Sequence, residues 1–284
     1  MKNFRTSLLV LITLIFTVFT AGAGEAGMRD IVEVEVIKGD NIEKSTEIFT
    51  YTGSRGRIDF PGADNKVTEQ TPYIMTVDGG ENWIMGDKVK DRFYCSEMQT
   101  EEFFKNLGSQ VTDAIDFFNV KAQNPTIKKI LEEPGPEMLG YKTTHIQLET
   151  NAKAYSWVFF VKFEYSVKII SDIWYTTDVE IHPIRRKWID ALTQSGNNII
   201  DSMYTDFISN LPGPILKKQS VIDITDVRKN ETKTQKVHTQ VTEVKELSSE
   251  ELDKIFKMPE CEAMDDDEVE EKAKFLFDAG KLAL

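Results

Sequence analysis

The chain has 284 residues and a formal net charge of −13 at pH 7, with 47 acidic side chains against 34 basic ones. A chain of this length can form one large domain or two small ones around a sizeable core. The excess negative charge is repelled by phosphate groups, which argues against nucleic acid and anionic membrane surfaces as partners.

The first residues have the order of a secretory signal peptide. Lys2 and Arg5 precede an apolar run over 8–19, and small residues follow at 21–23. The apolar run is shorter than the roughly 20 residues that span a membrane, so an uncleaved anchor is the weaker alternative. We expect 1–23 to be removed on export to the periplasm or outside the cell, with no integral membrane span left. Loss of the two basic residues changes the net charge from −13 to −15.

Short segments with alternating apolar and polar residues follow, and they predict β-strands. Such segments lie at 31–37, 47–52, 56–60, 73–77, 83–85 and 92–95. The segments between these predicted strands are short and contain turn residues. Short connections favour antiparallel pairing, because parallel strands need long crossovers. Gly79 and Gly80 favour a two-residue hairpin turn, in which Asp78 caps the bend rather than binding a metal ion.

The hydrophobic period changes to three and four over 100–118, which predicts an amphipathic helix packed on the sheet. A second helical region covers 183–210, begins at Pro183 and is interrupted at 196–198. Further strands are predicted at 128–133, 141–149, 157–165, 168–176, 216–227 and 233–246. This order indicates the α+β class, with an antiparallel sheet that helices cover on one face.

Several short segments occur in a familiar order. They are Gly53 to Ile58, "IMTVDGGENWIM" with a strand ending at Tyr94, Gly140 to Thr143, Ile173 to Tyr175, and Thr242 to Val244 before Pro259. Over about 30–260, this order resembles exported bacterial proteins similar to the LolA and LolB lipoprotein carriers. The resemblance implies a curved antiparallel half-barrel, with helices closing its mouth and a concave face that holds acyl chains.

The chain departs from this family after Pro259, where Glu260, Cys261 and Glu262 begin an acidic extension. We therefore expect three parts: a signal peptide at 1–23, a LolA-like α+β domain at 24–260, and an acidic extension at 261–284. Cys95 and Cys261 form a disulfide or remain two free thiols. The sequence leaves both alternatives open, because it gives no distance between them.

An apolar groove between the sheet and the helices is the predicted ligand site, and a closed core is its alternative. The residues expected to line or cover the groove are Met75, Val77, Trp83, Met85, Trp157, Phe159 and Trp174, with Phe103 and Leu107 as lid. The three histidines (His145, His182, His238) lack metal-binding spacing, and we expect them at the surface or in the sheet. No catalytic, metal or cofactor motif is present.

Three functions follow from these observations. The first is a non-enzymatic exported protein that binds a lipid, an acyl chain or a lipoprotein. The second is a structural or protein-interaction module of the cell envelope with a filled core, in which the acidic extension contacts a partner protein. The third is a hydrolase that uses two close carboxylates, at least one of them with a raised pKa.

Overall fold

The computed structural model describes residues 27–61, 66–89, 92–102, 105, 120–122, 125–158, 161–257 and 261–263. The strands are β1 (Gly27–Lys38), β2 (Asn41–Thr52), β3 (Arg55–Asp59), β4 (Tyr73–Thr76), β5 (Asn82–Val89), β6 (Arg92–Gln99), β7 (Val120–Ala122), β8 (Thr126–Pro134), β9 (Thr144–Val158), β10 (Val161–Tyr175), β11 (Ile215–Asp226), β12 (Glu231–Leu247) and β13 (Glu262–Ala263). The helices with described bounds are α3 (Pro183–Leu192), α4 (Asn198–Ser209) and α5 (Ser249–Ile255).

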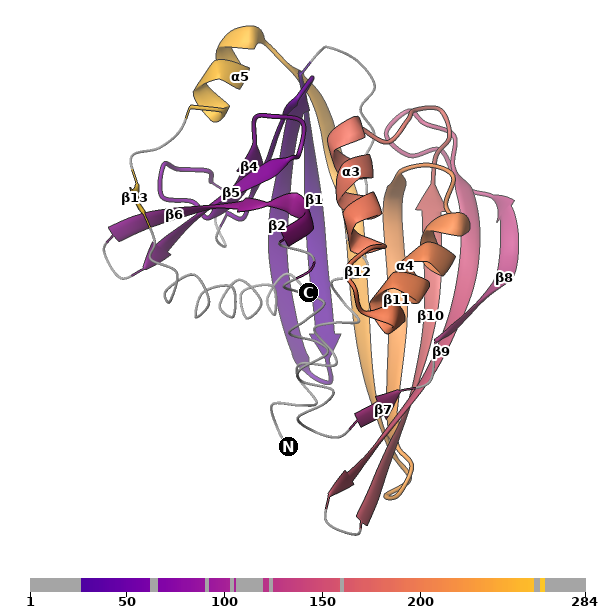
Figure 1. Ribbon diagram of the computed structural model, residues 1–284. Helices are drawn as coiled ribbons and strands as arrows, with labels where there is room; N and C mark the ends of the chain where they lie inside the picture. Colours follow the sequence, from indigo (N-terminus) through magenta and orange to yellow (C-terminus); the bar gives the residue numbers. More distant parts are fainter. Residues whose placement is uncertain are drawn as a thin grey trace.

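The strands form one open sheet with the order β13-β6-β5-β4-β3-β2-β1-β12-β11-β10-β9-β7, and β8 also pairs with β9. Pairing is antiparallel except between β13 and β6, which are parallel. In Figure 1, β4–β6 run across the direction of β9–β12, so the sheet bends between its two halves. A large, unclosed and mainly antiparallel sheet agrees with the predicted class. Among the described residues, no helix has the length and hydropathy needed to cross a membrane.

The predicted strand over 157–165 is wrong as a single strand. Its first residues end β9 and its later residues begin β10, with Val158 paired to Val161 across the hairpin. Apolar alternation continues through this turn, and no Gly, Pro, Asn or Asp marks it in the sequence. The predicted strands at 216–227 and 233–246 correspond to β11 and β12 and pair antiparallel as a hairpin.

The helical region predicted over 183–210 is confirmed as two helices. Pro183 occupies the first turn of α3, where its missing N–H is tolerated, and the Nδ1 atom of His182 accepts from the Ile184 N–H at 3.3 Å. Gly196 adopts a positive φ of 80° between the helices, a conformation that glycine allows without strain. His182 is therefore buried as a helix cap, contrary to the expected surface or sheet position.

Helices cover both faces of the sheet, whereas the sequence predicted cover on one face. We call the face under α3 and α4 the inner face. Its core contains Val34, Val237, Ile222 and Ile173 from the sheet, together with Phe207 from α4. In Figure 1, α3 lies in front of the upper part of β12, beside β1, and α4 lies in front of the upper parts of β10 and β11.

We call the opposite face the outer face, and α5 covers it over β3–β5. Tyr73 and Met75 pack there against Leu252 and Phe256. Ser248 and Glu251 form a reciprocal capping box that fixes the start of α5. Because successive residues of a strand point to opposite faces, one strand contributes to both cores.

The turn between β4 and β5 is longer than predicted. It runs over 77–81, and Gly79 and Gly80 both have a positive φ. The carboxylate of Asp78 accepts from the backbone N–H groups of Glu81 and Asn82 at 3.0 and 3.1 Å, so it caps the turn. Of the helix predicted over 100–118, only 100–102 and 105 lie in the described part, and these residues are helical.

Candidate functional site

The structure divides the predicted groove residues between the two faces. Met75 pairs with Ile84 and faces α5, so Trp83 and Met85 on the same strand as Ile84 face α3. Val77 lies in the turn and is 47% exposed. Trp174 neighbours Ile173 and therefore lies on the outer face. These residues do not line one common surface.

Trp174 has its own surroundings on the outer face. Its ring stacks on His145 with 4.5 Å between centroids, and Lys217 lies 4.8 Å from the same ring. His145 also contacts a carboxylate oxygen of Asp172 at 2.9 Å. Phe103, Leu107 and Phe159 lie outside the described residues. The backbone of Trp157 pairs with Lys162 in the sheet, but the side chain of Trp157 lies outside the described part of the structure.

On the inner face, apolar side chains of the sheet pack against aromatic side chains of the helices. Trp83 contacts Trp188 of α3 edge-on, with 4.7 Å between ring centroids. Tyr204 and Phe207 of α4 are buried against the sheet. Ile184 of α3 packs so closely on Gly56 that a Cβ atom there would lie 3.2 Å from its side chain. The helices therefore lie directly on the sheet.

A buried charged cluster lies on the inner face beneath the start of α3. The Tyr51 hydroxyl donates to a carboxylate oxygen of Asp30 at 2.6 Å, and an Arg185 nitrogen lies 3.9 Å from the same oxygen. The guanidinium of Arg185 also lies 4.0 Å from the centre of the Phe49 ring. Burial lowers the pKa of Arg185, and the nearby Asp30 carboxylate opposes this shift. The cluster therefore connects β1, β2 and α3 by charge as well as by packing.

Glu47 extends this cluster along β2, in phase with Phe49, and is 5% exposed. Burial raises the pKa of Glu47 to about 7, although the positive charge of Arg185 opposes the shift. Burial also lowers the pKa of His182 to about 4, and Arg185 adds to that effect. At neutral pH, His182 is therefore uncharged, and Glu47 exchanges its proton near physiological pH.

Replacing Glu47 with glutamine is expected to flatten the pH dependence of stability. The folded pKa of about 7 lies above the ordinary 4.5, so wild-type stability falls as pH rises between these values. The full shift corresponds to about 3 kcal/mol, so the stability of Glu47→Gln relative to wild type should rise by up to that amount between pH 5 and pH 8. Urea unfolding at pH 5 and 8 measures the difference, with the exposed Glu69→Gln as control. Parallel pH profiles for both variants and wild type would contradict the shift.

Lys218 is a second buried charge-bearing group of the inner face and is 1% exposed. It pairs across the sheet with Thr239 and Ile173, and its Nζ lies 6.0 Å from the centre of the Phe207 ring. Burial lowers the pKa of Lys218 well below its ordinary value. The amine is therefore held beneath α4 in an environment that disfavours its charged form.

Replacing Lys218 with methionine should remove a rise of stability with pH. The folded pKa lies below the unfolded 10.5, so wild type gains about 1.4 kcal/mol per pH unit between the two pKa values. Relative to Lys218→Met, wild type should thus become more stable from neutral pH toward pH 10. Unfolding titrations across this range measure the gap, and the exposed Lys229→Met is the control. A constant gap would contradict the lowered pKa.

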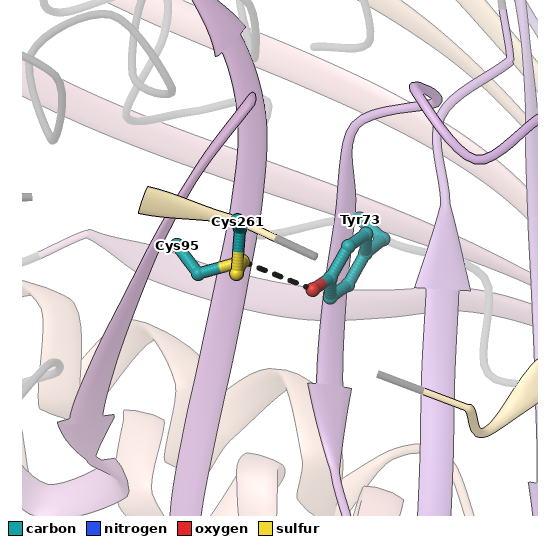
Figure 2. The surroundings of a disulfide bond; sticks show 3 residues. All are labelled: Tyr73, Cys95 and Cys261. Carbon is teal, nitrogen blue, oxygen red and sulfur yellow. Dashed lines mark hydrogen bonds between the residues drawn. A yellow bond between two sulfur atoms is a disulfide. The ribbon is translucent and has the colours of Figure 1, made fainter. Parts of the chain in front are cut away.

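A disulfide joins Cys95 of β6 to Cys261, at a sequence separation of 166. Figure 2 shows the Tyr73 hydroxyl beside this bond, 3.3 Å from the Cys95 Sγ. The bond attaches the start of the predicted acidic extension to the sheet, next to the parallel pairing of Glu262 with Tyr94. The division at 260/261 itself stays a prediction.

The buried charges of the inner face were not predicted, although strand periodicity contains a signal for them. Asp30 has the same phase as Val32, Glu47 the same phase as Phe49, and Lys218 the same phase as Ile222. A charged residue in the apolar phase of a strand is expected to be buried. Within the described residues, no group of three or more His, Cys, Asp or Glu side chains could hold a metal ion.

No protein-family model matches the chain, and no curated protein matches it. Among solved structures, PNGF-II is similar at 11% identity and a TM-score of 0.36, over 87% of this chain and 33% of that chain. A domain from Vibrio parahaemolyticus described as an outer membrane lipoprotein-sorting protein matches at 6% identity and a TM-score of 0.28, over 89% and 96% of the two chains. A DUF1329 family protein from Desulfovibrio piger ATCC 29098 matches at 9% identity and a TM-score of 0.26, over 90% and 96%.

This chain therefore spans about a third of the length of PNGF-II. At these low TM-scores, the similarities carry no argument about function, and the LolA and LolB resemblance stays an expectation from the sequence.

Proposed function

We propose that this protein is an exported, non-enzymatic binding protein that holds an acyl chain of a lipid or lipoprotein on the inner face of its sheet. The half-barrel arrangement and the periplasmic or secreted location belong to this proposal. Export is supported by the sequence of 1–23, which lies outside the described residues.

The observation that carries the proposal is the length of the inner face. Strands β9–β12 have 12 to 17 residues, and at about 3.3 Å per residue they extend about 40–55 Å. Helices α3 and α4 have 10 and 12 residues, which correspond to only about 15–18 Å. In Figure 1, the lower parts of β9–β12 extend beyond both helices.

Apolar side chains continue along the inner face beyond the helices. Phe163, Tyr165 and Ile224 are half-buried and have the same strand phase as the buried Val167 and Ile222. Apolar surface of this kind favours an extended hydrocarbon chain over a polar ligand, because burial of its methylene groups is favourable by about 0.8 kcal/mol each. The helices would then cover one end of the bound chain.

Mass spectrometry of an organic extract of the purified protein tests the proposal, together with titration of a fluorescent fatty acid. We expect retained lipid and saturable binding of the fluorescent fatty acid. Ile224→Asp should weaken that binding at least tenfold, because it places a charge on the inner face. Val221→Asp on the outer face of the same strand is the matched control. Absence of both retained lipid and saturable binding would refute the proposal.

A filled core beneath α3 and α4 favours the second candidate, an envelope interaction module. Tyr204 and Phe207 are buried against the sheet, so this end of the inner face is already occupied by side chains. The acidic extension would then contact a cationic partner protein. Deleting 264–284 keeps β13 and the Cys95–Cys261 disulfide, and it should weaken capture of that partner. Unchanged capture would exclude the acidic extension as the contact site.

The carboxylate-hydrolase alternative has one supporting feature and one opposing feature. Asp30 and Glu47 lie on the inner face of adjacent strands, and the pKa of Glu47 is raised. Both carboxylates, however, are buried beneath α3, and Asp30 already accepts from Tyr51. We therefore propose no reaction for this pair.

A further inference from the structure

β8 is an exposed edge strand with an unusual order of charges. Its residues 128–133 read Lys-Lys-Ile-Leu-Glu-Glu, and every one of them is exposed. The central pair is apolar, with Ile130 46% and Leu131 37% exposed. β8 pairs with β9 on one side, and among the described strands none pairs with its other side. In Figure 1, β8 lies at the right-hand edge of the sheet.

A bulge in β8 determines which charges share a face. Lys128 and Glu133 pair with Glu149 and His145 of β9, which lie four residues apart and therefore on one face. Lys129 and Glu132 pair with Leu148 and Ile146, on the other face. The register shifts between Lys129 and Leu131, which leaves Ile130 as the extra residue.

Without this bulge, Lys128 and Glu133 would lie on opposite faces, because they are an odd number of positions apart and side chains alternate. The bulge thus makes the strand complementary to itself. In an antiparallel pair about a two-fold axis between Ile130 and Leu131, Lys128 lies opposite Glu133 of the second copy. Lys129 then lies opposite Glu132 of the second copy, on the other face.

We propose that β8 pairs with β8 of a second copy of this chain in this antiparallel register, forming a two-fold symmetric dimer. Each interface is then the same patch on both copies, as closed dimers require. Unpaired N–H and C=O groups of the two edges would bond to each other, and the exposed Ile130 and Leu131 would be buried at the axis. Within each copy, the Nζ atom of Lys129 already lies 2.5 Å from a carboxylate oxygen of Glu132. Two such ion pairs would therefore meet at the axis.

Charge fixes the register of this pairing. A shift by two residues in either direction moves both lysines away from the glutamates of the second copy. Parallel pairing in register places Lys beside Lys and Glu beside Glu, which is unfavourable. Lysines and bulges on edge strands usually prevent association with other strands. Here two lysines precede the bulge and two glutamates follow it, so this edge matches an antiparallel copy of itself. One strand edge is a small interface, so we expect reversible association at micromolar or higher concentrations.

Sedimentation velocity of the full mature chain, from about 1 µM to several hundred µM, tests the proposal. Wild type should shift reversibly from monomer to dimer. The variant Lys128→Glu/Lys129→Glu should raise the dissociation constant at least tenfold, because four glutamates then face four glutamates. Glu132→Lys/Glu133→Lys should do the same with lysines. An equimolar mixture of the two variants should restore a dimer, since their edges are complementary.

Lys233→Glu/Lys236→Glu on the central strand β12 is the matched control, with the same change of net charge away from the edge. Circular dichroism and thermal midpoints establish that each variant is folded. If the Glu132/Glu133 variant fails to fold, since Glu133 contacts His145 at 3.2 Å, the Lys128/Lys129 variant against the β12 control still decides. A monomeric wild type, a dimer insensitive to the Lys128/Lys129 reversal, or a mixture of folded variants without heterodimer would overturn the proposal.

Discussion

Replacing Arg57 with methionine is expected to lower the free energy of unfolding by about 3–5 kcal/mol, the cost of breaking a buried ion pair. Two guanidinium nitrogens of Arg57 lie 2.7 and 2.8 Å from the same oxygen of Asp59, and both residues are buried on the outer face. A third nitrogen donates to the backbone carbonyl of Ile255 at 2.8 Å, and the guanidinium lies 4.2 Å from the Tyr73 ring. Arg57 thus joins β3, β4 and α5.

The physical reason for the large effect is the carboxylate that remains. Burial raises the pKa of Asp59, and the charge of Arg57 opposes that rise. Without Arg57, the pKa of Asp59 rises further, so the destabilisation should shrink as pH falls and the carboxyl becomes protonated. Urea unfolding at pH 7 and pH 4 measures both effects.

Two comparisons make the Arg57 experiment decisive. The double variant Arg57→Met/Asp59→Leu should recover most of the lost stability, because no charge is then left buried. Arg55→Met removes an ion pair with Asp253 of 3.4 Å that lies at the surface, and it should change stability by less than about 1 kcal/mol. Equal effects of Arg55→Met and Arg57→Met would contradict the structural account.

Sequence periodicity was sufficient for most elements of this fold and insufficient for their boundaries where no turn residue occurs. β11, β12 and the helix pair α3–α4 were predicted closely, because Asn230, Gly196 and Pro183 mark their ends. The end of β9 and the start of β10 were predicted as one strand over 157–165, because the sequence between them is as apolar as the strands themselves. A pattern of period two persists through such a turn and gives no local signal.

The candidate site was harder to predict because it depends on register between strands. Met75 and Trp83 each alternate correctly within their own segment. Met75 pairs with Ile84, so these two side chains share a face. Trp83 is the neighbour of Ile84 and therefore lies on the opposite face from Met75. A shift of one residue would exchange the faces, and a five-residue turn cannot be positioned to that accuracy from sequence. Helix α5 also separates the predicted groove residues, because it forms a second core on the outer face that was not predicted. Met75 is buried in that core and not in the inner one.

Removing the disulfide, with Cys95→Ala/Cys261→Ala, is expected to lower the free energy of unfolding by about 2–5 kcal/mol. The two cysteines have a sequence separation of 166, and the chain-entropy relation assigns about 5 kcal/mol to a loop of that length in the unfolded state. Among the described residues, β13 is otherwise held by its short parallel pairing with β6 and by an exposed contact of Arg92 with Glu262 at 3.2 Å. Such a surface contact is worth less than about 1 kcal/mol.

The location of the bond predicts where its loss is felt first. Cys95 packs against the outer-face core that contains Tyr73 and Leu252, and among the described residues it is not one of those packed on the inner-face core. Reduction should therefore increase amide hydrogen exchange in β6 and β13 strongly, and leave β10–β12 nearly unchanged. Reduced wild type and the double alanine variant should agree in unfolding midpoint. An unchanged midpoint would show that the bond does not stabilise the fold. An equal loss of protection in both cores would show that the two faces unfold as one unit.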